Sequence, residues 1–265
     1  MSTVGFIGVG NMGSAMISGI SKRNHDIKLY AYDVDKSKTS NLDSSINIAE
    51  SLIEICQKSK YIVLSVKPQF YPGLFKEIKN CLTKEHIIIT VAPGYSIAKV
   101  KLYLGNVVRV VRAMPNTPAL VGEGMTSYSF LNDEITEDEH NTIKGVFSSF
   151  GKSVKIDESN MEAIIATTGS SPAYAYLFIE AMADAAVSFG IPRDDAYMLS
   201  AQALKGAAQM VLDTKEHPAK LKDAVCSPGG TTIEAVLKLE ETQFRNSIIK
   251  AMTACYNKAN KMNKE

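Results

Sequence analysis

The chain has almost no net charge, few cysteines and no long apolar run, and each of these shortages excludes a class of protein. Its 29 lysines and arginines balance 28 aspartates and glutamates, so it lacks the basic surface typical of proteins that bind nucleic acid or anionic membranes. No apolar run approaches the roughly 20 residues that span a bilayer. The chain passes directly into an apolar strand at Val4–Ile7, without the segments of a secretory signal. We therefore expect a cytoplasmic protein that binds neither nucleic acid nor membrane.

The four cysteines, Cys56, Cys81, Cys226 and Cys255, are scattered along the chain. None forms a Cys-x-x-Cys pair, and no group of histidines and cysteines has the spacing of metal ligands. We interpret each as a buried or unreactive thiol in a reducing compartment, and we expect no metal site. A chemical role for Cys226, beside a Pro-Gly-Gly turn, is the weaker alternative.

Residues 1–157 alternate short apolar runs with amphipathic stretches. Near-continuous apolar runs of five or six residues are typical of parallel strands buried on both faces. Their alternation with helices predicts a doubly wound α/β domain of the Rossmann type. The expected strands are Val4–Gly8, Ile27–Tyr32, Tyr61–Val66, His86–Val91, Val107–Val111, Met125–Phe130 and Ser153–Ile156; the expected helices include Met12–Ser21, Ala49–Gln57, Phe70–Cys81 and Glu137–Phe150.

Residues 158–265 contain no strand candidate and predict an all-helical domain. The stretches Met161–Phe189, Asp194–Leu212 and Thr242–Asn263 carry apolar residues at helical spacing. The first two are rich in alanine, which lets helices approach closely. We expect this domain to pack against a second copy of the chain and form a homodimer.

A glycine motif follows the first strand and opens a helix. Gly8 permits a tight turn, Gly10 lets the backbone approach a pyrophosphate, and Gly13 lets helix and strand pack closely. An acidic residue, Asp33, follows Gly13 by twenty residues at the end of the second strand. This context predicts a dinucleotide-binding site.

The adenosine end of that dinucleotide has two possible recognition modes. Asp33 would accept hydrogen bonds from the ribose, which favours NAD. Lys36 and Lys38 lie a few residues further and would instead neutralise the 2′-phosphate of NADP, unless they are simply solvated. The choice between NADH and NADPH therefore stays open.

Three further loops follow expected strands at the edge where open α/β sheets bind ligands. They are Ser65–Pro68, Val91–Gly94 and Arg112–Pro118. Prolines restrict these loops, and their backbone groups, with Asn116 and Thr117, would meet the nicotinamide end. The alternative is that they are structural turns.

The stretch Asp223–Thr232 lies far from the glycine motif and breaks one helix before starting another. Ser227-Pro-Gly-Gly ends the first helix, and a threonine hydroxyl is expected to cap the second. The free N–H groups and positive dipole of such a helix start suit a small carboxylate. The chain is thus expected to bind a dinucleotide and a small anionic substrate.

Five segments together resemble the pyrroline-5-carboxylate reductase family, and the match runs over essentially the whole chain. The segments are Phe6–Gly13, Val66–Pro68, Met114–Pro118, Thr168–Tyr174 and Asp223–Thr232, the last being the family's signature. The resemblance implies reduction of the cyclic imine 1-pyrroline-5-carboxylate to L-proline by NADPH or NADH. It also implies a homodimer or an oligomer of dimers, in which the substrate loop of one subunit completes the site of the other.

The resemblance also assigns residues. It implies cofactor contacts at Ile7, Gly8, Val9, Gly10, Asn11 and Met12, with Gly13 closing the turn, and at Ser65, Val66, Lys67, Pro68, Val91, Ala92 and Pro93. It implies substrate contacts at Glu158, Thr231 and Thr232. The chain departs from the family where Ser171, Ser51 and Ala224 replace a glycine and two asparagines.

The chemistry requires little acid–base machinery, because a protonated imine is already electrophilic. We expect the substrate carboxylate to dock on the backbone N–H groups of Gly230, Thr231 and Thr232. The Thr232 hydroxyl would orient the ring nitrogen as the catalytic group, and Glu158 would support the iminium; the alternatives are a plain helix cap and a helix-entry carboxylate. The second hypothesis for an enzyme is a β-hydroxyacid dehydrogenase, but the stretch after Gly169 lacks the catalytic lysine that such an enzyme is expected to have there. A non-catalytic nucleotide-binding protein would have no use for the signature.

Overall fold

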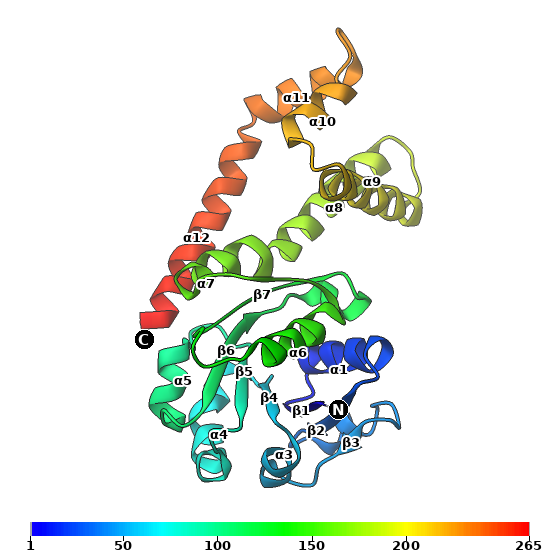
Figure 1. Cartoon of the computed structure of the whole chain (residues 1–265). Coiled ribbons are helices and arrows are strands. Elements are labelled where there is room, and N and C mark those ends of the chain that lie inside the picture. The colour runs from blue at the N-terminus through cyan, green and yellow to red at the C-terminus, as the bar shows by residue number, and fades with distance from the viewer. Residues whose placement is uncertain (1, 265) are drawn as a thin grey trace. The chain divides into compact units, whose positions relative to one another are not determined.

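The computed structural model describes residues 2–264 and divides into two compact units (Figure 1). The sheet unit runs up to Ser170 and includes the final segment from Cys255, whereas the helical unit is Ser171–Ala254. The sequence analysis expects a domain boundary after residue 157, whereas these two units divide after Ser170. The boundary at residue 157 stays a prediction.

Within residues 2–264 the sheet unit contains one sheet of eight strands, in the order β3-β2-β1-β4-β5-β6-β7-β8. The strands from β3 to β6 are parallel to one another, β7 is antiparallel to β6, and β8 is parallel to β7. Because the strand order reverses between β1 and β4, a crevice opens at their carboxyl ends. The strands are β1 Ser2–Ile7, β2 Ile27–Tyr32, β3 Asn47–Ile48, β4 Tyr61–Leu64, β5 Ile87–Thr90, β6 Arg109–Met114, β7 Gly124–Phe130 and β8 Gly151–Lys155.

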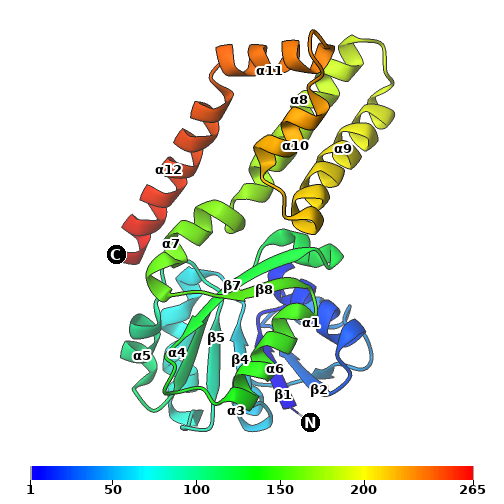
Figure 2. The same cartoon turned by 45° about the horizontal axis from the view of Figure 1, so that its top comes forward.

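Helices cover both faces of this sheet (Figures 1 and 2). Helices α1 and α6 pack on one face, and α3, α4 and α5 pack on the other. Strands β4 and β5 lie between the two layers and every residue in them is buried, which explains their apolar sequences. The predicted Rossmann-type doubly wound domain is therefore confirmed. The helices are α1 Asn11–Arg23, α2 Lys36–Thr39, α3 Leu52–Lys58, α4 Tyr71–Ile78, α5 Ile97–Leu104, α6 Glu137–Ser148 and α7 Met161–Ile164.

The structure adds one strand to the expected elements and corrects two others. Strand β3 was not predicted, because two residues carry no readable pattern. The strand expected at Val107–Val111 begins at Arg109 and continues to Met114, so the apolar run and the strand overlap only in part. The helix expected over Met161–Phe189 is interrupted by a π-helical turn at Ile165–Gly169. In that turn the hydroxyls of Thr167 and Thr168 donate to carbonyl oxygens four residues earlier, which competes with regular helix bonding.

The helical unit consists of α8 Ser171–Ser188, α9 Arg193–Thr214, α10 Pro218–Val225, α11 Thr231–Glu241 and the first half of α12 Phe244–Lys264. Helices α8 and α9 lie side by side as a hairpin (Figure 1). Their apolar side chains are largely exposed in the single chain, which is typical of a surface that a partner covers. The exposed residues include Tyr176, Leu177, Met198, Leu199, Met210 and Leu212.

The helix starts fall into two kinds. Helices α3, α5 and α6 are preceded by Ser51, Ser96 and Thr136, whose hydroxyls accept a hydrogen bond from a backbone N–H of the first turn. Helices α1 and α11 are preceded instead by Gly10 and Gly230, which have no side chain that could cap the helix. The first N–H groups of α1 and α11 are therefore left for another acceptor.

Three further findings concern the cysteines, possible membrane-spanning helices and possible metal sites. All four cysteines are free thiols. Within the described residues, no helix combines the length and the apolar character needed to cross a lipid bilayer. In the same residues, no group of three or more histidine, cysteine, aspartate or glutamate side chains is arranged to hold a metal ion.

Candidate functional site

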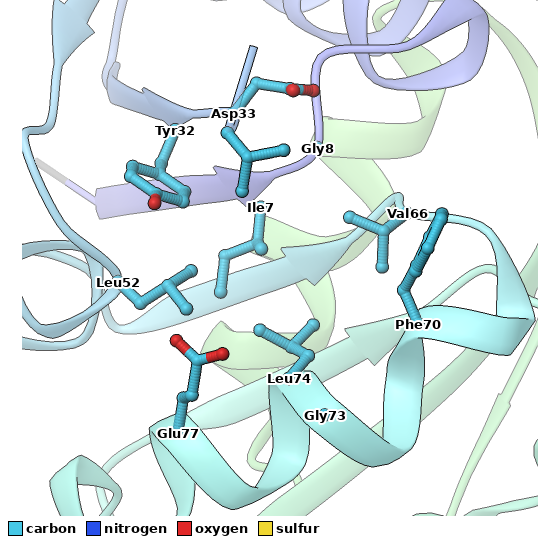
Figure 3. A pocket seen from close by; sticks show the side chains of 11 residues that line it. Ile7, Gly8, Tyr32, Asp33, Leu52, Val66, Phe70, Gly73, Leu74 and Glu77 are labelled. Carbon is cyan, nitrogen blue, oxygen red and sulfur yellow. The ribbon is translucent and has the colours of Figure 1, made fainter.

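Two cavities adjoin the glycine loop at the carboxyl ends of the strands. The β2 cavity, of about 300 Å³, is lined by Ile7, Gly8, Tyr32, Asp33, Val34, Leu52, Val66, Phe70, Gly73, Leu74 and Glu77 (Figure 3). The loop cavity, of about 520 Å³, is lined by Gly10, Asn11, Met12, Ser65–Pro68, Val91–Pro93, Met114, Pro115, Ile165, Gly169 and Ser170. Both cavities belong to the sheet unit. Together they bring most of the predicted cofactor residues to one edge of the sheet.

The glycine loop fits a diphosphate. Gly8 adopts a φ of +101°, a backbone conformation that side chains disfavour. A side chain at Gly13 would clash with the carbonyl oxygen of Gly8, whereas the space next to Gly10 is open to 4 Å. The loop therefore closes tightly between Gly8 and Gly13 and stays open at Gly10, where α1 presents its first N–H groups.

Asp33 lies next to this loop and is nearly buried, with 7% of its side chain exposed. Its carboxylate accepts a hydrogen bond from the Val9 N–H at 2.7 Å and another from the Asp35 N–H at 2.9 Å. The ammonium of Lys38 lies 3.4 Å away. Asp33 thus joins the end of β2 to the glycine loop while it lines the β2 cavity.

Apolar side chains make up the opposite wall of the β2 cavity. Figure 3 shows Ile7, Leu52 and Leu74 converging on its centre. A mostly apolar cavity next to an acidic strand end suits an adenine ring with its ribose. Sequence reasoning missed Leu52 and Leu74, because they look like ordinary core positions of helices α3 and α4.

A buried tyrosine links the ends of the two strands that lead into the walls of the loop cavity. The Tyr71 hydroxyl donates to the carbonyl oxygen of Leu64 at 2.7 Å and lies 3.1 Å from the Thr90 hydroxyl. Leu64 and Thr90 are the last residues of β4 and β5, directly before the loops Ser65–Pro68 and Val91–Pro93. Burial raises the pKa of Tyr71, so its hydroxyl stays protonated. Lys67 is the one charged residue that lines this cavity within residues 2–264.

Three predicted cofactor residues line neither cavity. Val9 and Gly13 shape the glycine loop through their backbones. The Asn116 side chain donates to the carbonyl oxygen of Thr168 at 3.0 Å and accepts from the Met125 N–H at 2.8 Å. Asn116 therefore fastens the loop after β6 to its surroundings, and a direct cofactor contact by it stays a prediction.

Glu158 is occupied by partners within the sheet unit. Its carboxylate accepts from the Ile97 N–H at 2.7 Å, at the start of α5, and lies 3.4 Å from the guanidinium of Arg112. Arg112 is almost fully buried and also pairs with Glu162 at 2.7 Å. Glu158 lines a separate cavity of about 450 Å³ beside α5. The structure therefore does not bring Glu158 into the loop cavity.

The signature segment lies in the helical unit. Helix α10 ends at Val225, Gly229 has a φ of +68°, and the Gly230 N–H donates to the carbonyl oxygen of Ser227 at 3.0 Å. The expectation of a hydroxyl cap was wrong, because Gly230 is the residue that precedes the first turn of α11. Thr231 and Thr232 lie inside that turn, where no capping bond uses their hydroxyls. Their backbone N–H groups also have no partner within the helix.

A Rossmann-type sheet with an open glycine loop, an acidic strand end and two adjoining cavities defines a dinucleotide-dependent oxidoreductase. Comparison with known proteins narrows this class. Residues 3–94 match a family model described as NADP oxidoreductase, coenzyme F420-dependent, and residues 158–262 match one described as pyrroline-5-carboxylate reductase dimerisation.

Known pyrroline-5-carboxylate reductases are similar to this chain over nearly its full length. The chain is 43% identical to pyrroline-5-carboxylate reductase of Escherichia coli K12, over 98% of both chains. The crystal structure of pyrroline carboxylate reductase from Plasmodium falciparum with NADP bound has a TM-score of 0.89 and 32% identity, covering 99% of this chain and 98% of that one. A structure from Coxiella burnetii has a TM-score of 0.90 and 32% identity, covering 100% of this chain and 99% of that one. The chain therefore belongs to the pyrroline-5-carboxylate reductase family.

Membership confirms the main interpretation of the sequence. The chain is an NAD(P)H-dependent oxidoreductase with a Rossmann-type domain and a helical dimerisation domain. The expected homodimer agrees with that second domain and with the exposed apolar helices. The β-hydroxyacid dehydrogenase and the non-catalytic protein are thereby set aside.

Proposed function

We propose that this chain reduces 1-pyrroline-5-carboxylate to L-proline with NAD(P)H, the final step of proline biosynthesis, and that α11 holds the substrate. The observation that carries the proposal is a pair of helix starts, each preceded by a glycine that has no side chain to cap it. Helix α1 begins at Gly10 beside the cavities, and α11 begins at Gly230 in the signature segment. Two such starts suit two anions, the cofactor diphosphate and the substrate carboxylate.

The cofactor would be held by the chain's own strand ends. Ile7–Gly13 would surround the diphosphate, Asp33 would bind the adenosine ribose, and the β2 cavity would take the adenine ring. Ser65–Pro68 and Val91–Pro93 would position the nicotinamide end in the loop cavity. Bound there, NAD(P)H supplies the hydride. Asn116 contributes by fixing the neighbouring loop, and we retain it as a candidate contact.

The substrate carboxylate would dock on the N–H groups of Thr231 and Thr232 in the first turn of α11. The Gly230 N–H already donates to the carbonyl oxygen of Ser227, and a side chain at Gly230 would clash with the Ser227 hydroxyl. Gly230 therefore keeps this turn compact, and its N–H becomes a further donor to the carboxylate once the bond to Ser227 opens. The positive end of the helix dipole strengthens this attraction. Recognition of the carboxylate in this way needs no arginine or lysine.

The Thr232 hydroxyl is free to act on the ring nitrogen, because no capping bond uses it. In the proposed pose it accepts a hydrogen bond from the protonated imine and holds the ring in one orientation. Orientation is the main contribution required, since a protonated imine accepts hydride without a strong acid or base. Glu158 would add electrostatic support for the positive nitrogen, although Ile97 and Arg112 hold its carboxylate in the described conformation.

Thr232→Ala tests the proposed role directly. We expect it to lower kcat for oxidation of NAD(P)H with pyrroline-5-carboxylate by about ten- to a thousandfold, the range for losing one positioned group. Thr232→Ser keeps the hydroxyl and should recover much of the rate. Thr242→Ala, which removes a hydroxyl bonded to Lys238 at the other end of α11, is the matched control. An unchanged rate in Thr232→Ala would remove the role of this residue.

A cytoplasmic location is the second part of the proposal. The four free thiols support it, because secreted proteins commonly oxidise such residues to disulfides. Cell fractionation with antibody detection tests it; recovery of the protein with an extracytoplasmic fraction would contradict it.

A further inference from the structure

The charge lining the β2 cavity is of one sign. Within the described residues that line it, Asp33 and Glu77 are the charged ones, and no lysine or arginine is among them (Figure 3). Asp33 is fixed there by two backbone N–H groups, those of Val9 and Asp35, at 2.7 and 2.9 Å. With 7% of its side chain exposed, this carboxylate is poorly screened by water.

The nearest cations are already engaged by carboxylates. Lys38 lies 3.4 Å from Asp33 and 3.9 Å from Asp35, so its ammonium already serves two carboxylates. Lys36 pairs with Glu50 at 3.4 Å on the surface, with 84% of its side chain exposed. Neither lysine lines the β2 cavity. A 2′-phosphate would therefore have to draw these lysines away from the carboxylates that they pair with.

The two reduced cofactors differ at the adenosine ribose. NADH has a 2′-hydroxyl, which donates a hydrogen bond to a carboxylate. NADPH has a 2′-phosphate, which carries close to two negative charges at neutral pH and no donor. Placing that phosphate beside a nearly buried carboxylate brings like charges together, an arrangement that discriminates strongly between ligands.

We infer that Asp33 makes this chain selective for NADH over NADPH. The inference rests on the proposed function, because it names the cofactor used at that same site. Asp33 acts by accepting from the ribose hydroxyl and by repelling a phosphate at the same position.

The test compares the two cofactors in binding and in catalysis. Titration calorimetry gives the Kd of NAD⁺ and of NADP⁺ without any imine, and kcat/KM is then measured with NADH and NADPH. Wild type should favour the non-phosphorylated cofactor by about tenfold or more in both measurements, which corresponds to about 1.4 kcal/mol. Asp33→Asn removes the charge but keeps the shape and one acceptor oxygen. It should shift the ratio toward the phosphorylated cofactor by about tenfold.

A matched control separates the local charge from the overall charge. Asp43 also accepts a hydrogen bond from a backbone N–H, that of Ser45, at 2.9 Å, and it lines neither cavity. Asp43→Asn changes the net charge of the protein by the same amount and should leave the cofactor ratio unchanged. An equal shift in Asp43→Asn would overturn the role of Asp33.

Two further results would overturn the inference. One is a wild-type protein that binds NADP⁺ as tightly as NAD⁺; this measurement stands even if Asp33→Asn fails to fold. The other is a folded Asp33→Asn protein with an unchanged ratio. Failure of the proposed function would look different, because imine reduction would then be absent with either cofactor while the binding ratio stayed measurable.

Discussion

Glu139 is expected to make the sheet unit sensitive to acid. Its carboxylate lies 2.7 Å from the ammonium of Lys60 and 2.7 Å from the guanidinium of Arg109, and it accepts from the Thr136 N–H in the capping box of α6. Burial alone would raise the pKa of this carboxyl. The hydrogen bonds from Lys60, Thr136 and Arg109 outweigh burial and lower the pKa to about 2.

The magnitude follows from this difference in pKa. The ordinary value is 4.5, so the drop to about 2 corresponds to about 3 kcal/mol of stability at neutral pH. Because the pKa is lower in the folded state, the contribution is complete above about pH 4.5 and is lost as the pH falls toward 2. Only 7% of the Glu139 side chain is exposed, but 41% of the Lys60 side chain is, so solvent screens part of their attraction. We expect Glu139→Gln to cost up to about 3 kcal/mol at pH 7, since it leaves two cations without their partner.

Urea unfolding followed by far-UV circular dichroism measures this cost, because the chain has no tryptophan to report by fluorescence. The protein concentration is held constant, since a dimer's stability depends on it. Glu137→Gln, an exposed glutamate in the same first turn, is the control and should cost only a few tenths of a kcal/mol. The gap between wild type and Glu139→Gln should narrow steadily from pH 4.5 to the lowest pH at which both fold. Equal costs for the two variants, or a gap independent of pH, would refute the reasoning.

Three other outcomes follow from the site. Tyr71→Phe should cost about 1–3 kcal/mol in urea unfolding, because the Leu64 carbonyl loses its donor, and should weaken NAD(P)H binding; unchanged binding would contradict the link to the loop cavity. Gly10→Ala should change stability by less than about 1 kcal/mol, because the space next to Gly10 is open, and yet weaken NAD(P)H binding about tenfold or more. Gly13→Ala should lower both stability and binding, because its side chain would clash with the Gly8 carbonyl oxygen. Thermal unfolding measures the stability and cofactor titration measures the binding. Mixing the Gly13→Ala and Thr232→Ala proteins under conditions of subunit exchange tests whether each site takes its substrate loop from the partner subunit. If it does, about half of the dimers are mixed and one of the two sites in each is intact, so about a quarter of the wild-type activity should return. No recovery of activity would favour sites within one chain.

The sheet core could be predicted from the sequence, because strands that are buried on both faces consist of nearly continuous apolar residues. Tyr61–Leu64 and Ile87–Thr90 are apolar at nearly every position for that reason. The glycine loop was equally readable, since tight turns and close packing restrict residue choice. The direction of β7 was not predicted, although only nine residues lie between Met114 and Gly124, too few for a parallel crossover.

Contacts between distant parts of the chain could not be read in the same way. Glu158 accepts from a residue 61 positions away, and Asn116 donates to one 52 positions away. Neither side chain differs in sequence from one that faces a ligand, so only the fold assigns its partner. The start of α11 was misjudged by a smaller margin: threonine is a good capping residue, but Gly230 already has the extended backbone that a cap requires, with φ −81° and ψ 169°.

In the proposed pose, the start of α11 recognises the substrate through its carboxylate. L-proline carries the same acid group on the same ring position as the imine, so backbone N–H donors have little means of telling the two apart. If the proposed docking holds, the product should therefore compete with the imine for the same N–H groups.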